Sequence, residues 1–581
     1  MKNRRACFVK RRPVYAMGPL PDLRELLQRA LLINGEKTVL RETKSGEIIQ
    51  YSCKNILDDV HALGTALIDY GYQDTHIALV GENSYLWFIS YMAVVCGVGV
   101  IVPLDKELTD DNLFSLALKG DANALIYSKT YRGAAKLLES EHVKGFAFEA
   151  LSGVDESKSL PGMIRHGKEL ISRGDRRYLD RQIDREKVAA ILFTSGTTGA
   201  NKGVMLSHKN ICANVDNIFR AAPCEPESIS ILPFHHTIEF NCHILPGILE
   251  GMNIYICSSL KRLTDTMKIV KPGMALVVPL FLETLYKTIW AEAKREGRTR
   301  DLEIVIKMSN MFLKLGIDLR NVLFKQLKDN LGGKFDLVVC GGAAADPEVI
   351  RGLYSCGIDV ITAYGLTECS PVVSINVDAH KHAESVGKPL GSLQVKIDNE
   401  DNNGVGEIYV KGDTVMLGYY KDDAATAATF DGDWLKSGDY GKLKGRKQLT
   451  VVGRKKNLIV LNNGKNVHPE EIEATIIHEL PYVKEAMVYS SNYKVKETLM
   501  QTIAAALKIE VEEYFGKMDR ETVERLVAED IRRVNKLLPG YKQMHQLFIT
   551  QDDFLKTTTQ KVIRHKVIEE QNKSFGDGII L

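Results

Sequence analysis

Residues 194–203 read TSGTTGANKG, and this stretch decides how the chain is expected to fold and bind its ligand. It directly follows the apolar run AAILF at 189–193, which predicts a buried strand. The stretch should therefore lie at a strand's carboxyl end, where open α/β sheets bind their ligands. Its glycines let the backbone turn and approach a ligand closely. Its hydroxyls, its amides and the ammonium of Lys202 indicate an anion-binding loop.

This loop is not a Walker A motif. That motif requires GxxxxGK[ST], whereas Asn201 precedes the lysine here and Gly203 follows it. A P-loop kinase is therefore disfavoured. A turn of small residues without a ligand is the simpler alternative, but the hydroxyls and the lysine exceed what a turn needs.

The composition is that of an ordinary globular protein with several cores: 581 residues, of which 45% are hydrophobic and 26% charged. The 76 basic and 74 acidic side chains nearly balance, so nothing in the overall charge favours a nucleic-acid partner. None of the ten cysteines forms a CxxC pair, which favours a reducing compartment. The apolar run 87–103 ends like a strand and predicts a buried helix and strand. We expect a cytoplasmic protein with no transmembrane segment, and at most peripheral membrane association.

Short apolar runs alternate with helical patterns over most of the chain, which predicts an α/β fold with mostly parallel sheets flanked by helices. The predicted strands lie at 76–81, 100–105, 124–128, 189–193, 254–257, 275–279, 336–340 and 359–364. Residues 281–333 show a helical, Lys/Arg-rich pattern. From residue 405, short strands and glycine turns predict a smaller β-rich unit, and a compact βα pattern follows residue 454.

The loop at 194–203 resembles the phosphate-loop signature TSGTTGxxKG of the adenylate-forming superfamily, which groups acyl-CoA synthetases, firefly luciferases and peptide-synthetase adenylation domains. Asn201 stands where most members have proline. The resemblance implies ATP-phosphate contacts from Thr194, Ser195, Gly196, Thr197, Thr198, Gly199 and Lys202.

Two further stretches resemble the nucleotide site of this superfamily. AYGLTE at 363–368 is similar to its second signature, which implies that Tyr364 and Gly365 meet the adenine, Thr367 the α-phosphate and Glu368 the Mg²⁺ ion. CGGAA at 340–344 resembles the turn that places Gly342 and Ala343 against the adenine, at the start of the acyl pocket.

The later part of the chain resembles the superfamily's ribose clamp and hinge. By this resemblance Asp439 accepts from the ribose hydroxyls, Arg454 joins it, and Lys456 marks the hinge. The resemblance implies a large N-terminal domain over 1–453, which includes the β-rich unit, and a hinge at 454–456. It implies a small, mobile α+β lid domain over 457–581.

The remaining signatures concern the acid, the catalytic lysine and coenzyme A. LPFHHT at 232–237 resembles the motif whose histidine, here His236, lines the acyl-carboxylate entrance. The loop KTTTQK at 556–561 resembles the one that carries the catalytic lysine, here Lys561, with Gln560 in place of the usual glycine. The loop of Gly464 and Lys465 resembles the one that flanks the pantetheine of coenzyme A.

Together these motifs predict that a carboxylate attacks the α-phosphate of Mg-ATP and forms an acyl-adenylate, which passes its acyl group to coenzyme A. The segment FHHTIE at 234–239 and the helical insertion ending at 330–334 most resemble the corresponding segments of long-chain fatty acyl-CoA synthetases. A medium-chain or aryl acid as substrate, and acyl carrier protein as acceptor, stay open. So does a catalytically inactive ATP-binding protein, which the presence of Lys202, Glu368 and Lys561 disfavours.

Overall fold

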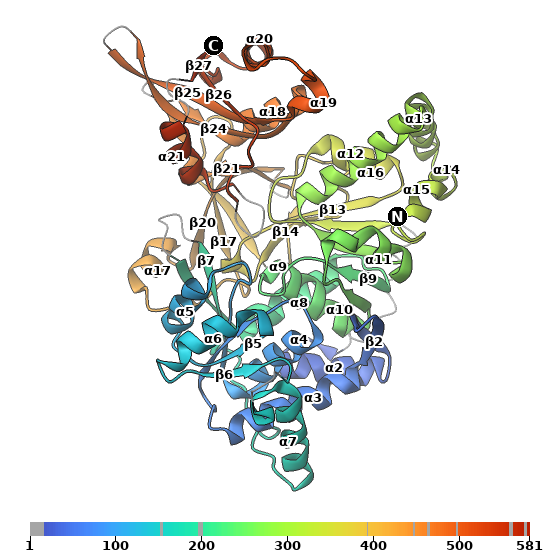
Figure 1. Ribbon diagram of the computed structural model, residues 1–581, viewed down its shortest axis with the longest axis vertical. Helices are drawn as coiled ribbons and strands as arrows, with labels where there is room; N and C mark the ends of the chain where they lie inside the picture. The colour runs from blue at the N-terminus through green and yellow to red at the C-terminus, as the bar shows by residue number, and fades with distance from the viewer. Residues whose placement is uncertain are drawn as a thin grey trace. The chain divides into compact units, whose positions relative to one another are not determined.

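The computed structural model describes residues 17–150, 155–195, 201–391, 393–445, 448–461, 465–495, 498–556, 562–574 and 578–581 (Figure 1). The chain divides into two compact units. The first comprises Met1–Val395 and Val410–Leu435, and the second comprises Lys396–Tyr409 and Lys436–Leu581.

The phosphate loop belongs to a seven-stranded sheet of the first unit. Its strands, in order, are β18 (Gly418–Tyr419), β8 (Asn201–Ser207), β7 (Val188–Ser195), β4 (Val100–Pro103), β3 (His76–Val80), β5 (Ala122–Tyr127) and β6 (Lys144–Ala147). From β7 to β6 the strands run parallel, whereas β7, β8 and β18 pair antiparallel. Helices α5 (Asp110–Lys119) and α6 (Arg132–Glu139) pack on this sheet through their buried apolar side chains.

A nine-stranded sheet forms the rest of the first unit. Its order is β15 (Lys388–Pro389), β14 (Val372–Asn376), β13 (Asp359–Gly365), β12 (Leu337–Cys340), β11 (Met274–Val277), β9 (Glu227–Ser230), β10 (Asn253–Ile256), β1 (Thr38–Lys44) and β2 (Glu47–Ser52). The strands from β13 to β1 are parallel, and only the edges are antiparallel. Helices α11 (Leu263–Val270), α12 (Pro279–Arg295) and α16 (Pro347–Ser355) share its apolar core.

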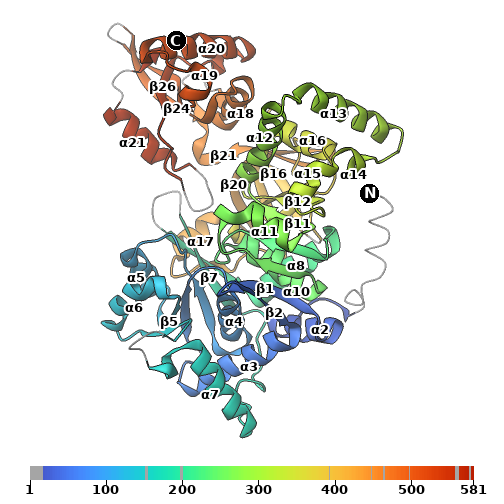
Figure 2. The ribbon, with the colours of Figure 1, turned by 45° about the vertical axis from the view of Figure 1, so that its right-hand side comes forward.

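Other helices of the first unit connect and cover these sheets. They are α2 (Leu23–Asn34), α3 (Cys53–Asp69), α4 (Tyr85–Ala93), α7 (Leu160–Ser172), α8 (His208–Ala221), α9 (Thr237–Glu239), α10 (Leu245–Glu250), α13 (Thr299–Lys314), α14 (Arg320–Leu323), α15 (Lys325–Asn330) and α17 (Asp423–Thr429). Figure 2 shows α13 along the outside of α12 and α16. The predicted helical stretch at 281–333 is thus confirmed as α12 to α15.

Besides the short pair β22 (Ile459–Val460) and β23 (Asn466–Val467), the second unit holds two larger sets of strands. The first set, most of whose residues belong to this unit, comprises β16 (Gln394–Asp398), β17 (Gly406–Lys411), β20 (Trp434–Lys444) and β21 (Gln448–Arg454). The second is a sheet in the order β24 (Val483–Val495), β25 (Thr498–Ile509), β26 (Gln546–Thr550) and β27 (Ile579–Ile580). Helices α18 (Pro469–Glu479) and α20 (Arg520–Leu537) pack on it, and α21 (Arg564–Ser574) follows. Pro469, Glu470 and Glu471 open α18, where proline and acids suit the free amides of a first turn.

The predicted fold class is confirmed: mostly parallel, helix-flanked sheets followed by a smaller α+β part. The compact units divide the chain differently from the predicted boundary, because β17, β20 and β21 group with the C-terminal residues. The boundary at 453/454 and the hinge stay predictions. The apolar run 87–103 folds as α4, a π-helical segment (Val94–Val98) and β4. Among the described residues, no helix is long and apolar enough to cross a membrane.

Candidate active site

The two ends of the phosphate loop are held by the hairpin of β7 and β8. Thr194 pairs with Lys202 in its register, and Ser195 pairs with Asn201. The ammonium of Lys119 donates a 2.6 Å hydrogen bond to the carbonyl of Asn201. Four predicted phosphate ligands, Gly196, Thr197, Thr198 and Gly199, lie outside the described residues.

Lys202 lies against an aromatic ring from a distant part of the chain. Its Nζ is 4.6 Å from the centre of the Tyr419 ring, which the pairing of β18 with β8 brings next to Val204. Gly203 follows the lysine at a closely packed point, where a Cβ would lie 2.9 Å from a methyl of Ile191. An ammonium over an aromatic face is attracted by the ring quadrupole, so Tyr419 orients the lysine.

The hydroxyl of Tyr419 donates a 2.9 Å hydrogen bond to Oε1 of Glu368. Burial and the neighbouring carboxylate raise the pKa of Tyr419, so the phenol stays protonated and acts as a donor. The backbone supports the same contact, because the amide of Met416 donates to the carbonyl of Glu368 at 2.8 Å. The structure thus links the predicted phosphate lysine and the predicted magnesium ligand through one buried tyrosine.

The second predicted nucleotide stretch lies at the carboxyl end of β13. Tyr364 is buried there, and Gly365 follows at a point where a Cβ would stand 2.0 Å from the carbonyl oxygen of Pro371. Only glycine fits this approach. Thr367 and Glu368 then form a single 3₁₀ turn (Thr367–Cys369) and are both half-buried.

The GGA turn lies at the same edge of the sheet, because β12 and β13 are parallel and Cys340 pairs with Thr362. Gly342 has a φ of +90°, which favours glycine, and both Gly342 and Ala343 are exposed. A Cβ on Gly341 would lie 2.7 Å from the Cδ1 of Ile238. Since Ile238 belongs to α9, the structure brings the histidine segment to this turn.

His236 is half-buried and caps α9. Its Nδ1 accepts a 3.2 Å hydrogen bond from the amide of Ile238. A neutral imidazole that accepts at Nδ1 carries its proton on Nε2, so the far side of the ring is a donor. The neighbouring His235 has its Nε2 3.4 Å from Asp105, and burial lowers its pKa.

Buried amides hold the loop that follows Glu368. Asn214 accepts from the amide of Val372 at 3.2 Å and donates to the carbonyl of Asn241 at 3.1 Å. Asn241 in turn donates to the carbonyl of Ser370 at 3.2 Å. Sequence reasoning missed this support and missed Tyr419, since none of these residues stands in a recognisable motif.

In the second unit, the predicted ribose residues form an ion pair. Asp439 on β20 lies opposite Arg454 on β21, and the Nε of Arg454 is 2.9 Å from the Oδ1 of Asp439. The side chain of Asp439 is 5% exposed and that of Arg454 is 41% exposed, so the guanidinium faces solvent. Lys456 follows on a 3₁₀ turn (Lys455–Asn457) and is exposed.

Lys561 and Gly464 lie outside the described residues, but the base of each loop is described. The amide of Ile563 donates to the carbonyl of Leu555 at 2.8 Å, and Lys556 bridges to Val562. Leu461 donates to the carbonyl of Lys465 at 3.0 Å and closes the other loop.

Arg564 anchors the end of the lysine loop. Its Nη2 lies 2.6 Å from each carboxylate oxygen of Glu473, and its Nη1 donates to the carbonyl of Val488 at 2.9 Å. Burial raises the pKa of Glu473, although Arg564 opposes this shift. One turn earlier on α18, Glu470 accepts a 2.7 Å hydrogen bond from Asn457 next to the predicted hinge. The first turns of α18 therefore hold both the hinge segment and the end of the lysine loop.

The described residues contain no group of three histidine, cysteine, aspartate or glutamate side chains that could hold a metal. A single carboxylate at Glu368 still suits Mg²⁺, which keeps waters and is commonly held by one or two carboxylates together with substrate phosphates. Tyr419 contacts both Lys202, whose ammonium can bind an anion, and Glu368, whose carboxylate can bind a cation.

Comparison with known families decides the identity. The family described as AMP-binding enzyme matches residues 27–420, and its C-terminal domain matches residues 456–575. This chain belongs to the AMP-binding enzymes.

Among curated relatives, the long-chain-fatty-acid–CoA ligase 5 of Rattus norvegicus is 28% identical over 637 positions, which cover 99% of this chain and 92% of the relative. Two solved structures share the fold. The adenylation domain of a carboxylate reductase from Mycobacterium chelonae has a TM-score of 0.76 at 19% identity, covering 95% of this chain and 90% of that one. The o-succinylbenzoate CoA synthetase of Bacillus subtilis, in complex with ATP and a magnesium ion, has a TM-score of 0.69 at 17% identity. The match covers 94% of this chain and 99% of that one.

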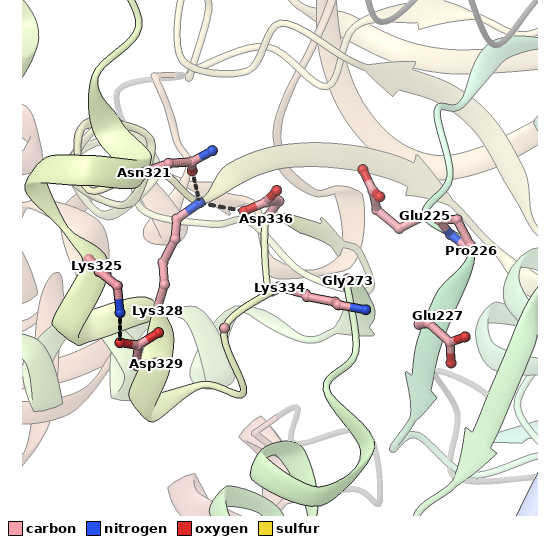
Figure 3. Close-up of a pocket in the computed structure, with 11 residues that line it drawn as sticks. Glu225, Pro226, Glu227, Gly273, Asn321, Lys325, Lys328, Asp329, Lys334 and Asp336 are labelled. Carbon is pink, nitrogen blue, oxygen red and sulfur yellow. Dashed lines mark hydrogen bonds and ion pairs between the residues drawn. The ribbon is translucent and has the colours of Figure 1, made fainter.

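A cavity of about 600 Å³ in this AMP-binding enzyme lies elsewhere, at the amino ends of β9, β11 and β12 (Figure 3). Lys328 crosses it, bonded to Asn321 at 2.6 Å and paired with Asp336. Its lining mixes lysines with carboxylates and includes the end of the helical insertion at Gly333 and Lys334. These residues of the insertion therefore lie at the sheet edge opposite the GGA turn.

Proposed function

We propose that this chain activates a long-chain fatty acid with ATP, releasing pyrophosphate and forming an acyl-adenylate, and then transfers the acyl group to coenzyme A. The observation that carries the proposal is a pair of contacts: the ammonium of Lys202 lies over the ring of Tyr419, and the hydroxyl of Tyr419 donates to Glu368. These contacts lie at the carboxyl ends of strands, in a member of the AMP-binding enzymes. The acid and the acceptor are those in the name of a relative that matches nearly the whole chain.

In this proposal the first unit binds the triphosphate and the acid. Thr194 to Gly199 and Lys202 hold the phosphates, Tyr364 and Gly365 with Gly342 and Ala343 hold the adenine, and Thr367 contacts the α-phosphate. The Nε2 proton of His236 donates to the acid carboxylate. This hydrogen bond orients the carboxylate toward the α-phosphate and requires no change in the protonation of the ring.

Glu368, together with phosphate oxygens and water, would hold Mg²⁺. The ion neutralises phosphate charge and so reduces the repulsion between an anionic acid and anionic ATP. Tyr419 fixes the Glu368 carboxylate by its hydrogen bond, so little reorganisation is needed when the ion binds. The fold neighbour from Bacillus subtilis, solved in complex with ATP and a magnesium ion, supports the use of Mg-ATP.

The second unit supplies the remaining groups. Asp439 and Arg454 bind the ribose, Lys561 neutralises charge that develops between the carboxylate and the α-phosphate, and Gly464 and Lys465 flank the pantetheine. Lys456 lies in the hinge of 454–456, between a large domain over 1–453 and a lid over 457–581. We also infer a cytoplasmic location, which the nine free cysteines among the described residues support.

The test is pyrophosphate release and AMP formation with saturated acids of four to eighteen carbons, with coenzyme A or acyl carrier protein as acceptor. Each methylene buried in an acyl site contributes about 0.8 kcal/mol, or about fourfold in kcat/KM. We expect kcat/KM to rise with chain length, reach a maximum among the long acids, and require coenzyme A.

Three outcomes contradict parts of the proposal. A maximum at short or aromatic acids would refute the substrate, and turnover only with carrier protein would refute the acceptor. ADP in place of AMP, or no acid-dependent pyrophosphate release, would refute adenylation itself.

A further inference from the structure

Helix α13 and its C-terminal cap, Leu315, expose a row of apolar side chains to solvent. Ile304, Met308, Met311 and Leu315 are 48, 39, 52 and 68% exposed. Their spacing of four, three and four residues places them on one face of a helix. The opposite face is covered, since Ser309 is buried and donates a 2.9 Å hydrogen bond to the carbonyl of Ser355 at the end of α16.

The apolar surface continues past the helix. Ile317 is 47% exposed and Val322 is 74% exposed, so residues 304–322 contain six of the 19 exposed large apolar side chains of the described chain. We call these six the α13 face. Single exposed apolar residues need no explanation, but a group of this size marks an interaction surface.

The charge beside this face is positive. Residues 304–315 read IVIKMSNMFLKL, so Lys307 and Lys314 are their only charges. Together with Arg300 these lysines recur every seven residues, which places all three along one flank of the face. Among the described residues, none of the three forms an ion pair or a side-chain hydrogen bond. The helix's acids, Asp301 and Glu303, stand in its first turns, and Asp301 lies 3.8 Å from Arg298.

We propose that the α13 face docks this protein on the surface of an anionic lipid bilayer. A helix that lies in the interface of a bilayer buries one apolar face and keeps lysines and arginines for the headgroups. Long lysine side chains suit this position, because their methylenes extend along apolar surface while the ammonium stays in water. Residues 304–315 hold no acid, and Asp318, the one acid within 304–322, is paired with Arg320 at 2.8 Å, so an anionic surface exerts little repulsion on this face.

This proposal rests on the face itself and not on the proposed reaction. If both hold, an enzyme on the bilayer would take its acid from the membrane in which long-chain acids dissolve. The protein can therefore lack vesicle binding and still have the proposed activity, or bind vesicles and lack that activity.

The experiment uses the full chain with sucrose-loaded vesicles of phosphatidylcholine, alone or with one quarter phosphatidylglycerol, in a co-sedimentation assay. We expect binding to the anionic vesicles that weakens in high salt. The double variant Met308→Gln/Met311→Gln should bind at least about tenfold more weakly, because two apolar side chains lose their transfer into the interface. Lys307→Gln/Lys314→Gln should lose about fivefold for each lysine on anionic vesicles.

The matched control is Leu32→Gln/Ile269→Gln, which removes two apolar side chains outside the α13 face that are 75 and 69% exposed on α2 and α11 of the same unit. We expect unchanged vesicle binding in this variant. Pyrophosphate release with a water-soluble acid, and the thermal midpoint, should match the parent protein in all variants.

Several results would overturn the proposal. They are no vesicle binding by the parent protein, equal loss in the control, or undiminished binding by the Met308/Met311 variant. A concentration-dependent dimer that this variant abolishes, without vesicle binding, would instead assign the face to a second copy of the chain.

Discussion

The hydroxyl of Tyr419 donates a 2.9 Å hydrogen bond to the carboxylate of Glu368. The two residues stand 51 positions apart and belong to one compact unit. The bond gives the predicted magnesium ligand a fixed orientation, and the same ring lies 4.6 Å from the ammonium of Lys202.

The first prediction concerns this bond. Tyr419→Phe keeps the ring under Lys202 but removes the donor to Glu368. A hydrogen bond to a charged group contributes about 1.5–3 kcal/mol, so we expect kcat/KM for Mg-ATP to fall at least about tenfold. KM for the acid should change little.

The matched control is Tyr420→Phe, whose hydroxyl bonds to Asp121 at the exposed surface. Its kinetics should equal those of the parent protein. If Tyr419→Phe has the same kcat/KM for Mg-ATP as the parent protein, the hydroxyl of Tyr419 does not assist magnesium binding and the side chain serves packing alone.

The second prediction separates the two half-reactions at Lys561. Lys561→Ala should slow adenylate formation by about 10²–10³-fold or more, because a preorganised charge is lost. Thioester formation from supplied acyl-adenylate should be spared. Stopped-flow pyrophosphate release measures the first half-reaction, and thioester yield measures the second.

Lys556→Ala serves as control, since Lys556 stands at the base of the same loop and lies 3.0 Å from Glu485. It should retain adenylation. Adenylation rates within about threefold of the parent in Lys561→Ala would place the catalytic lysine elsewhere.

The third prediction concerns the anchor of that loop. Arg564→Lys keeps the charge but cannot span both oxygens of Glu473 and the carbonyl of Val488, because an ammonium lacks the planar fork of a guanidinium. We expect adenylation to fall about tenfold, the cost of one charged hydrogen bond. The thioester half-reaction should stay within about threefold if Arg564 acts through the lysine loop.

Arg525→Lys on α20 is the control, since Arg525 forms an exposed pair with Glu529 at 3.3 Å. It should leave both half-reactions unchanged. Equal losses in both half-reactions of Arg564→Lys, with a lowered thermal midpoint, would mean that the anchor serves stability alone.

The fourth prediction concerns acid stability. His208 is buried, its Nδ1 accepts from the amide of Leu23 at 3.3 Å, and burial lowers its pKa to about 4. Above pH 6.5 both the folded and the unfolded state are neutral at this residue. Between pH 6.5 and 4 this histidine binds a proton in the unfolded chain but stays neutral in the folded chain, so the free energy of unfolding falls as the pH is lowered. The loss should reach about 2 kcal/mol at pH 5.

In the variant His208→Asn, the asparagine oxygen can still accept from the amide of Leu23, but the side chain does not titrate. The fall in the free energy of unfolding between pH 6.5 and 5 that comes from His208 should therefore be absent. The measurement is urea unfolding followed by tryptophan fluorescence. All three tryptophans, Trp87, Trp290 and Trp434, belong to the first unit. His382→Gln, at an exposed histidine, should keep the parent's pH dependence. A constant difference between His208→Asn and the parent from pH 7.5 to 5 would contradict the titration.

Local patterns predicted much of the fold, whereas most residues of the nucleotide site came from the family resemblance and stay predictions. The apolar runs at 189–193, 336–340 and 359–364 became β7, β12 and β13, because buried parallel strands need continuous apolar sequence. The residues that follow them lie at the carboxyl ends of these strands, as predicted, and the binding of ATP there stays a prediction. The turn at Gly342 could be predicted from the sequence, whereas the close approach of Gly365 to the carbonyl of Pro371 could not.

By itself, the sequence determined the strands, the helices, the order of the motifs and hence the family. Only the tertiary structure decided which side chains support those motifs: Tyr419 beside Glu368, Asn214 beside Val372 and Glu473 beside Arg564. It also decided that α13 leaves its apolar row uncovered, since an amphipathic pattern does not say which neighbour covers a face. The physical reason is common to these cases. Propensity and burial period act over neighbouring residues, whereas a contact between distant residues depends on the order in which strands join a sheet and on how helices pack upon it.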